Sequence, residues 1–339
     1  MKFGLLVIGP AGSGKSTFCY YLHQHMQVLR RHCRLVNLDP AAEYFAYQPD
    51  IDIRDLVTVQ DVEDELHLGP NGALVFAMEF LQQRIDWLET QFADFGEDEL
   101  FILDCPGQVE LYTHLALMAE ICNSMQAWGL RLCACCCLDV SFMTDSAKLL
   151  GGSLMALSAM VQLELPHINL LTKCDLVDKN LSLMPSRKSR AAGRRRRPER
   201  ADEHAEGDFD SEDEPEDETE ADEANSSTSR SFGLSALAAW PDYGDEPTDA
   251  KEAAIDALLS RDPHQIVQQL DECMPAKYKA LNAAFATLVE DYGLVSYLPC
   301  NVLDEESLAV VTSALDHALQ YGEDLEVRES DVIGNAEGA

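Results

Sequence analysis

The feature that most constrains how this chain can fold is a glycine-rich octapeptide near its amino terminus. It reads Gly9-Pro10-Ala11-Gly12-Ser13-Gly14-Lys15-Ser16 and fits the pattern G-x-x-x-x-G-K-[ST] at every fixed position. A short apolar run precedes it and helical periodicity follows it, a setting that argues against a chance glycine-rich turn. The sequence therefore predicts a buried strand, a loop that wraps phosphate groups, and a helix that begins behind them.

Each position of this loop has an expected task. Glycine lets consecutive backbone N–H groups curl around phosphates, and the positive end of the following helix points at them. Lys15 would place its charge near the β- and γ-phosphates, and Ser16 would supply an oxygen to Mg²⁺. The candidate nucleotide-binding residues of the loop are Gly12, Ser13, Gly14, Lys15, Ser16 and Thr17.

Short apolar segments alternate with helical patterns over the first half of the chain. The apolar segments are rich in Val, Ile, Leu or Cys on both faces, as parallel strands covered on both sides require; they lie at 3–8, 33–38, 100–104, 132–139 and 167–173. Helical stripes run from Phe18 to Leu29, from Leu74 to Phe92 and from Leu111 to Met125. This alternation predicts a layered α/β sheet with right-handed crossovers. With the glycine-rich loop, the expected fold is a P-loop NTPase of three α/β/α layers, with a mostly parallel central sheet and helical insertions.

The chain changes character after about residue 180. Residues 187–197 hold seven basic side chains and no acid, and residues 199–223 hold fifteen acids. Apolar residues are too sparse there to offset chain entropy, so we expect 181–262 to be a largely disordered charged insertion in a core formed by 1–180. The basic run has two interpretations, a nuclear-import signal and a solvated linker.

Regular structure is expected again from residue 263. A long apolar stripe runs from Ile266 to Tyr292, and Pro275 should interrupt it to give two helices. A strand is expected over 295–300, followed by a helix that Asp304 caps. We expect 263–325 to complete the first sheet, and 326–339 to form a flexible tail.

A second motif favours guanine as the base. Thr172-Lys173-Cys174-Asp175 follows an apolar strand and resembles the [N/T]KxD element of GTPases. The Asp175 carboxylate can accept from both N1–H and N2–H₂ of guanine, and adenine offers no such pair of donors. The stem of Lys173 can lie along the face of the base. Thr172 stands where Asn is commoner, which removes one amide contact.

A third motif, Asp104-Cys105-Pro106-Gly107-Gln108-Val109-Glu110, follows the strand at 100–104. Asp104 would hold Mg²⁺ directly or through water, and the Gly107 backbone would approach a γ-phosphate. Gln108 and Glu110 would orient the attacking water. The alternative is a helix amino terminus that carries polar residues for its own stability.

Asp39 lies in a fourth motif, Asn37-Leu38-Asp39-Pro40, at the end of the second strand. Its carboxylate would contact the Mg²⁺ shell or polarise water. The alternative is an ordinary helix N-cap that precedes Pro40 at the first helical position.

Charge and cysteine content limit the classes of function. The chain has 25 Lys and Arg against 60 Asp and Glu, a net charge of −35, so direct nucleic-acid binding is not expected. No apolar stretch approaches about 20 residues, so no membrane span is expected. The cluster at 133–137 alternates between strand faces and cannot converge on one metal, so we expect buried reduced thiols and a reducing compartment.

Together with Gly69-Pro70-Asn71, these motifs make the chain resemble the GPN-loop GTPases over 1–180 and, more weakly, 263–325. Four segments look closest to the third eukaryotic paralogue: Tyr44 to Arg54, the Gly-Pro-Asn-Gly stretch at 69–72, Leu-Tyr-Thr-His-Leu at 111–115, and Gln-Tyr-Gly-Glu-Asp-Leu-Glu at 320–326. The resemblance implies a GTPase that binds GTP or GDP with Mg²⁺. In relatives a helical insertion occupies the region of 181–262, from which this chain departs.

The resemblance also implies an assembly. Family members form homodimers or heterodimers, here with the first paralogue, and the loop carrying Asn71 would reach the γ-phosphate side of the partner's site. Asp39, Asp104, Gln108 and Glu110 match the family's metal and water positions. The third paralogue is associated with RNA polymerase II assembly and nuclear import, which implies polymerase subunits or assembly factors as partners. Such a protein would be cytoplasmic with shuttling to the nucleus.

Two other functions fit the phosphate-binding loop. A P-loop kinase for a small molecule would need lid arginines, and the chain has few Arg outside 187–200. A non-catalytic scaffold would bind GTP for structure alone. Product analysis separates the kinase, and GTP retained without phosphate release would mark the scaffold.

Overall fold

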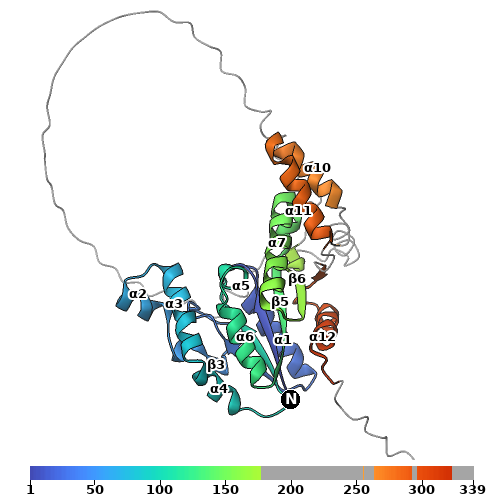
Figure 1. Cartoon of the computed structure of the whole chain (residues 1–339). Coiled ribbons are helices and arrows are strands. Elements are labelled where there is room, and N and C mark those ends of the chain that lie inside the picture. Colours follow the sequence, from blue (N-terminus) through green and yellow to red (C-terminus); the bar gives the residue numbers. More distant parts are fainter. Residues whose placement is uncertain (177–254, 256–262, 292–295, 323–339) are drawn as a thin grey trace, which may run out of the picture. The chain divides into compact units, whose positions relative to one another are not determined.

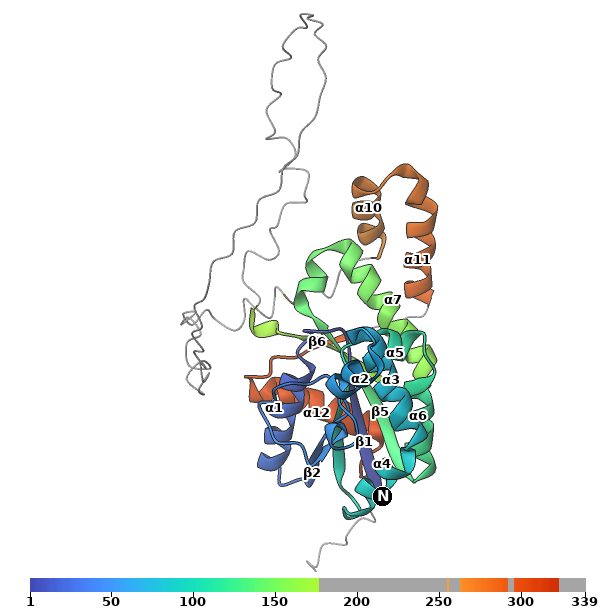
Figure 2. The same cartoon turned by 90° about the vertical axis from the view of Figure 1, so that its left-hand side faces the viewer.

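The computed structural model describes residues 1–176, 255, 263–291 and 296–322. The predicted charged insertion 181–262, apart from Ile255, lies outside the described residues, and so does the predicted tail 326–339. Figures 1 and 2 show the described elements in two perpendicular views.

Seven strands form one sheet in the order β3-β2-β4-β1-β5-β6-β7, and every pair in it is parallel. The strands are β1 (Lys2–Ile8), β2 (Cys33–Asn37), β3 (Ile51–Asp52), β4 (Leu100–Asp104), β5 (Leu130–Asp139), β6 (His167–Thr172) and β7 (Tyr297–Pro299). Strand β1 lies between β4 and β5, so the chain moves to opposite sides of β1 in its two halves. A loop that leaves the carboxyl end of β1 therefore stands at the crevice where such sheets bind ligands.

Helices cover both faces of this sheet. The longer ones are α1 (Lys15–Val28), α2 (Val59–Leu66), α3 (Pro70–Gln83), α4 (Ile85–Ala93), α6 (Leu117–Ala127), α7 (Ser146–Leu163), α10 (Pro263–Cys273), α11 (Lys279–Asp291) and α12 (Glu305–Leu319). Helices α1 and α12 pack on one face, where Phe18 and Leu22 meet Val311 and Leu315 in one core. Helices α3, α4, α6 and α7 share the core on the other face. These layers confirm the predicted α/β/α fold, and the parallel sheet with its β1 loop is that of a P-loop NTPase.

Local sequence explains where several helices begin. Thr58 accepts from the Asp61 N–H at the start of α2, and Asp145 accepts from the Ala147 N–H at the start of α7. Asp304 caps α12, as predicted, by accepting from the N–H groups of Glu306 and Ser307. Each cap satisfies backbone donors that the first turn of a helix leaves unpaired.

Two apolar stripes that look continuous in the sequence each form two separate helices in the structure. The stripe from Leu74 to Phe92 breaks at Arg84 (φ −113°, ψ 35°), between α3 and α4. The stripe from Leu111 to Met125 breaks after the four-residue helix α5 (Glu110–Thr113) and resumes in α6. Both breaks are short enough to keep the same side buried, which is why the periodicity hides them.

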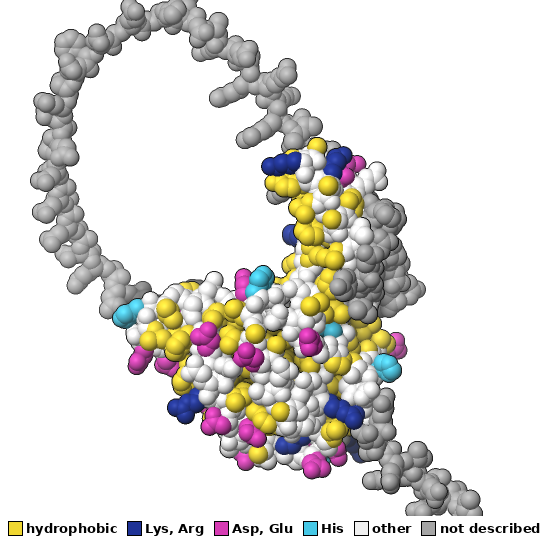
Figure 3. Space-filling view, in the orientation of Figure 1, with side chains coloured by type: hydrophobic (Ala, Val, Ile, Leu, Met, Phe, Trp, Pro, Cys, Tyr) yellow, Lys and Arg dark blue, Asp and Glu magenta, His cyan; other side chains and the backbone are white. Residues whose placement is uncertain are grey.

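The carboxyl-terminal part confirms two expectations. Pro275 separates α10 from α11, and β7 pairs with β6 in parallel, so this part completes the first sheet. The hairpin of α10 and α11 packs against α7, where the Ser146 hydroxyl donates to the Gln269 side chain. Its outward side carries the exposed apolar residues Met274, Tyr278, Leu281 and Leu288, and Figure 3 shows apolar surface along it.

The chain has 11 cysteines, and the ten whose side chains the structure describes are all buried and free. Burial raises the pKa of the Cys133 and Cys33 thiols to about 12. Among the described residues, no group of three or more His, Cys, Asp or Glu is arranged to hold a metal. The cysteines of β5 divide between the two cores, with Cys136 in one and Cys133, Cys135 and Cys137 in the other.

One described helix, α7, is long and apolar enough to cross a membrane by length and composition. Its residues Ala156, Ala159 and Leu163 are buried in the core that covers one face of the sheet. Acidic side chains are spread over the core in Figure 3, in keeping with the overall charge of the chain.

Candidate functional site

The glycine-rich loop connects β1 to α1 as predicted. Gly12 (φ 74°) and Gly14 (φ 88°) adopt left-handed conformations that side chains disfavour, and Gly14 is the N-cap of α1 without any side-chain cap. The first N–H groups of the helix therefore point outward for an anion. Lys15 is buried and its ammonium donates to the Pro10 carbonyl at 3.2 Å, while Ser16 and Thr17 are exposed. The loop is a phosphate cradle with its cation held in place.

Two glycines let backbones approach closely at this end of the sheet. A Cβ on Gly9 (φ 138°) would lie 2.3 Å from the carbonyl oxygen of Cys137 on β5. A Cβ on Gly107 would lie 3.0 Å from Cα of Ala11 in the loop. The segment after β4 is therefore seated directly on the phosphate loop, where the sequence places Gly107.

Asp104 ends β4, with Val7 and Asn37 as its neighbours on β1 and β2. Its side chain is 2% exposed, and burial raises its pKa, although the hydroxyls of Ser16 and Tyr47 oppose the rise. Oδ2 accepts from the Tyr47 hydroxyl at 2.8 Å. Oδ1 is buried and accepts no hydrogen bond from the described residues.

This donor set fits Mg²⁺. The ion prefers oxygen ligands, keeps several waters and binds through one or two carboxylates with substrate phosphates. The unpartnered Oδ1 of Asp104 and the exposed Ser16 hydroxyl are oxygens of that kind, at the mouth of the phosphate loop. A cage of three acidic or histidine side chains is not required for such a site.

Asp39 lies in the segment after β2, and no helix begins at Pro40, so the N-cap interpretation is wrong. Burial raises the pKa of Asp39, against the hydrogen bond from the Ala41 N–H and the charge of Lys15. The side chain of Asn37 holds this segment from both sides: its amide donates to the Asp39 carbonyl and its oxygen accepts from the Asp39 N–H. Asp39 is thus fixed within electrostatic reach of Lys15.

A salt bridge supports the same segment. Arg54 pairs with Asp52 at 2.5 Å and donates to the Ala42 carbonyl at 3.0 Å. Burial raises the pKa of Asp52, but hydrogen bonds from Arg54 and Asn37 outweigh it and lower the pKa overall. The Arg54 guanidinium also lies 4.7 Å from the ring centroid of Phe45. These contacts tie the 39–50 segment to the edge of the sheet.

Gln108, Glu110 and Asn71 come together around one cavity of about 550 Å³. Asn71 is exposed in the first turn of α3, and Glu110 is the first residue of α5. The Oε1 atom of Gln108 is buried and has no hydrogen-bond partner among the described residues. Within one chain, therefore, Asn71 already shares a cavity with Gln108 and Glu110. Helix α5 has only four residues, so its own stability accounts poorly for two polar residues at its start.

The base motif follows β6. Thr172 is 2% exposed, and its hydroxyl oxygen lies 2.6 Å from the Ser13 carbonyl oxygen and 3.1 Å from that of Leu138. Lys173 has a left-handed backbone (φ 61°), pairs with Asp139 at 2.6 Å, and carries its stem past Gly14. Asp175 is half-buried. The structure thus directs the Thr172 hydroxyl toward the phosphate loop and pairs Lys173 with Asp139.

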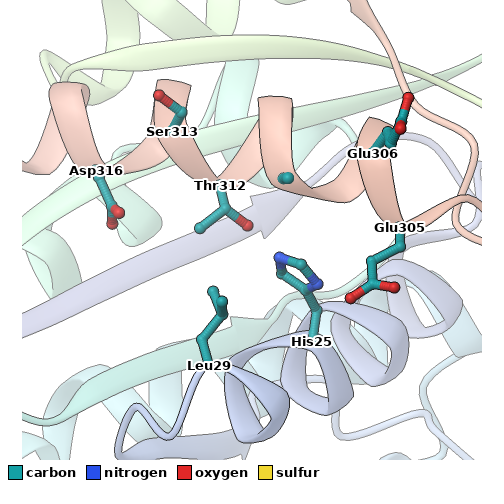
Figure 4. Close-up of a pocket in the computed structure, with 8 residues that line it drawn as sticks. His25, Leu29, Glu305, Glu306, Thr312, Ser313 and Asp316 are labelled. Atoms are coloured by element: carbon teal, nitrogen blue, oxygen red, sulfur yellow. The ribbon is translucent and has the colours of Figure 1, made fainter.

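A second cavity, of about 470 Å³, lies between α1 and α12 and shares no residue with the site above. Figure 4 shows His25 and Thr312 pointing into it. His25 is ten residues along α1 from Lys15, which corresponds to about 15 Å of helix. This cavity is therefore separate from the phosphate loop.

Sequence reasoning missed several residues that shape the site. Tyr47, Asn37, Arg54 and Asp139 each contact a predicted residue or its support. Asn37 and Asp139 had a usable signal, because both end strands at the carboxyl edge of the sheet. Tyr47 had none, since it lies in an irregular loop 57 positions before Asp104.

Comparisons with known proteins agree with this geometry. The family model described as "Conserved hypothetical ATP binding protein" matches residues 7–206. GPN-loop GTPase 3 of Aspergillus fumigatus is 39% identical over 97% of this chain and 94% of its own length. GPN-loop GTPase 3 of Mycosarcoma maydis is 35% identical over 97% and 95%, and that of Danio rerio is 36% identical over 97% and 91%.

A solved structure is also similar: a GTPase from Pyrococcus abyssi in its apo form, with a TM-score of 0.47 and 24% identity, covering 56% of this chain and 72% of that one. The curated relatives span nearly the whole chain at well over 30% identity. The sequence motifs and the comparisons agree, and the resemblance to the third eukaryotic paralogue is confirmed. This chain belongs to the GPN-loop GTPase family.

Proposed function

We propose that this chain binds GTP with Mg²⁺ and hydrolyses it to GDP and phosphate. The observation that carries the proposal is the uncapped start of α1 behind Gly14, with Lys15 buried at its first turn. Backbone N–H groups, a helix dipole and a fixed ammonium together favour a polyphosphate. That cradle also offsets the strongly acidic charge of the rest of the chain.

Guanine is the favoured base, although the matching family model is described by ATP binding. The half-buried Asp175 stands beyond Lys173, and Thr172 is engaged with the phosphate loop. A carboxylate there accepts two hydrogen bonds from guanine and would face only acceptors and one distant amine on adenine. The names of the relatives, which are GTPases, support the same choice.

Ser16 and Asp104 would hold Mg²⁺, and Asp39 would act on its water shell. The ion held by these residues would supply positive charge against the negative charge that develops in phosphoryl transfer. The residues of the chain do the rest: Asp104 presents Oδ1, Lys15 stays near the phosphates, and the Gly107 backbone stands beside Ala11 of the loop.

Gln108 and Glu110 are proposed to orient the attacking water, because they border the cavity that Asn71 shares. An amide oxygen and a carboxylate can orient a water by accepting hydrogen bonds from it. The Asn71 side chain offers polar groups for charge that builds on the γ-phosphate. In a dimer this loop would act on the partner's nucleotide, as the family resemblance implies.

The proposal extends to partners and location. A homodimer, or a heterodimer with the first paralogue, would bring two nucleotide sites together, and polymerase II subunits or assembly factors would be the clients of the GTP switch. The protein would work in the cytoplasm and shuttle to the nucleus, with the basic run 187–197 as a candidate signal. These assignments rest on the family resemblance, and neither nucleic acid nor membrane is a proposed ligand.

The test measures nucleotide preference and turnover together. Purified protein is titrated with fluorescent GTP and ATP, and phosphate release and products are followed. We expect a preference for GTP that falls about 10- to 100-fold in Asp175→Asn, since a two-bond contact to a base edge discriminates by about 1–3 kcal/mol. Asp94→Asn, an exposed carboxylate remote from the motifs, is the matched control and should bind as wild type.

Hydrolysis is tested in the Gln108→Ala, Glu110→Ala double variant. Phosphate release should fall at least about 100-fold, the lower range for positioned acid–base groups, while GTP affinity stays within a few fold. Unchanged turnover would remove the water-orienting role. A phosphorylated small-molecule product would establish a kinase, and GTP retained for hours without phosphate release, even with a partner, would establish a scaffold.

A further inference from the structure

The two oxygens of the Asp104 carboxylate have different surroundings. Oδ2 accepts a hydrogen bond of 2.8 Å from the Tyr47 hydroxyl, and Oδ1 is buried without a partner among the described residues. We infer that Tyr47 is a positioning residue: it occupies Oδ2 and so presents Oδ1 alone to the nucleotide-bound Mg²⁺. This inference rests on the proposed function, because it assigns the geometry of the same Mg²⁺ site.

The backbone of Asp104 is fixed by strand pairing on both sides, so only its side chain can rotate. Asp104 closes β4 between two parallel neighbours, and its register is fixed opposite Val7 on one side and Asn37 on the other. A carboxylate at such a position can still rotate and offer one oxygen or both. A hydrogen bond to one oxygen removes that freedom, in the way that outer partners of metal ligands fix ligand orientation.

The preference of Mg²⁺ makes this orientation matter. The ion demands near-ideal octahedral geometry, whereas Ca²⁺ accepts carboxylates through both oxygens at longer distances. A carboxylate restricted to Oδ1 suits the smaller ion and leaves room for water and phosphate oxygens. Tyr47 would therefore set both the strength and the selectivity of the site.

Tyr47 is itself held in place. Its ring centroid lies 4.9 Å from that of Phe45. The Arg54 guanidinium, which pairs with Asp52, also lies over the Phe45 ring. Tyr47 is half-buried, whereas Tyr44, three residues earlier in the same loop, is 91% exposed. The loop thus carries one tyrosine directed at the site and one in solvent.

That pair supplies a matched experiment. Tyr47→Phe removes the hydroxyl and keeps the ring, and Tyr44→Phe removes a hydroxyl from the exposed position. The release rate of fluorescent GDP is measured by stopped flow at rising free Mg²⁺, and again in EDTA. In Tyr47→Phe the Mg²⁺ concentration that half-maximally slows release should rise about 10- to 100-fold, the usual loss for an outer partner of a metal ligand. Release in EDTA should stay within twofold of wild type, and Tyr44→Phe should match wild type in both.

The outcomes separate the inference from the function beneath it. A wild-type midpoint in Tyr47→Phe would overturn the inference, and so would an equal acceleration in EDTA, which would mean that Tyr47 supports the nucleotide and not the metal. Wild-type protein whose GDP release ignores Mg²⁺ would overturn the Mg²⁺ part of the proposed function, and the inference with it. Phe45→Leu, which leaves the hydroxyl but loosens its seat, should shift the midpoint in the same direction by less. A thermal unfolding curve accompanies each variant.

Discussion

The hydroxyl oxygen of Thr172 lies 2.6 Å from the backbone carbonyl oxygen of Ser13, which fastens the base motif to the phosphate loop. The contact joins segments 159 residues apart in sequence, and both ends of it are buried. The buried Thr172 hydroxyl therefore holds the base motif against the phosphate loop. The sequence pattern alone shows only that an amide contact is missing there.

Thr172→Val should weaken nucleotide binding. The isosteric change leaves the Ser13 carbonyl buried without its donor, at a cost of about 1–3 kcal/mol, or about 5- to 150-fold in affinity. Thr172→Ser keeps the hydroxyl and should bind within about threefold of wild type. Titration with fluorescent GDP measures both variants. A loss in Thr172→Ser together with wild-type affinity in Thr172→Val would show that the methyl group, and not the hydrogen bond, holds the loop.

Gly9→Ala should unfold the protein far more readily than Gly129→Ala. Both glycines have positive φ, 138° and 88°, but an added Cβ at Gly9 meets the Cys137 carbonyl, whereas one at Gly129 meets no atom within 4 Å. The left-handed conformation alone costs about 1–2 kcal/mol in Gly129→Ala, and the clash at Gly9 adds to that. Urea unfolding followed by tryptophan fluorescence gives the difference. Similar midpoints for the two variants would contradict the close approach of β1 and β5.

Stability should depend on His167 between pH 6.5 and 4. Burial lowers the pKa of His167 to about 4, so the folded state binds fewer protons there than the unfolded state. Above about pH 6.5 the ring is neutral in both states, so the free energy of unfolding does not depend on it. As the pH falls from 6.5 toward 4, protonation of the unfolded state lowers the free energy of unfolding by at most about 3 kcal/mol. His167→Gln should flatten this part of the stability curve.

The control for that experiment is His32→Gln, because His32 is exposed. Carboxylates also titrate in the same range, so the quantity to compare is the difference in slope between each variant and wild type. An identical slope in His167→Gln and wild type would show that the ring charges without resistance and that its burial has no electrostatic cost.

Arg31 and Asp316 should couple α1 to α12. The guanidinium makes two bonds of 2.8 and 2.9 Å to the carboxylate and lies 3.9 Å from the ring centroid of Tyr321. A double-mutant cycle of Arg31→Met and Asp316→Asn should give about 1–2 kcal/mol of coupling, since the pair is partly buried and one guanidinium nitrogen, Nη1, contacts both carboxylate oxygens. Asp98→Asn breaks an exposed pair with the amino terminus and should change stability by less than about 1 kcal/mol. Coupling near zero would mean that the apolar contacts of α12 suffice.

The parts of the fold that could be predicted are those with a local signal. The phosphate loop, the strand ends at Asp104 and Thr172, and the cap at Asp304 are each specified by a few adjacent residues. Strand β3 has only two residues, too few for any periodicity, and the break at Arg84 carries neither Gly nor Pro. Helix α7 is apolar along most of its length, so no amphipathic stripe marks it in the sequence, although Asp145 caps it.

The residues of the candidate site also fall into two groups, those with a local sequence signal and those without one. Motif residues could be assigned from spacing, because their chemistry depends on neighbours in the chain. The roles of Tyr47 and Arg54 depend on contacts that form only when the irregular loop folds back onto β4 and the sheet edge. Pairs of this kind leave no periodic trace in one sequence. They are visible only once the backbone is placed.

The position of β7 has a consequence for the order in which the chain is made. β6 ends at Thr172, but its neighbour β7 begins only at Tyr297, and α12 follows later still. At a synthesis rate of about 5–20 residues per second, this gap of 125 residues takes roughly 6–25 s. During that interval β6 is an open edge strand, and the face under α1 lacks the apolar side chains of α12. The nascent enzyme therefore passes through a stage in which its phosphate loop is complete while its sheet can still pair with a foreign strand.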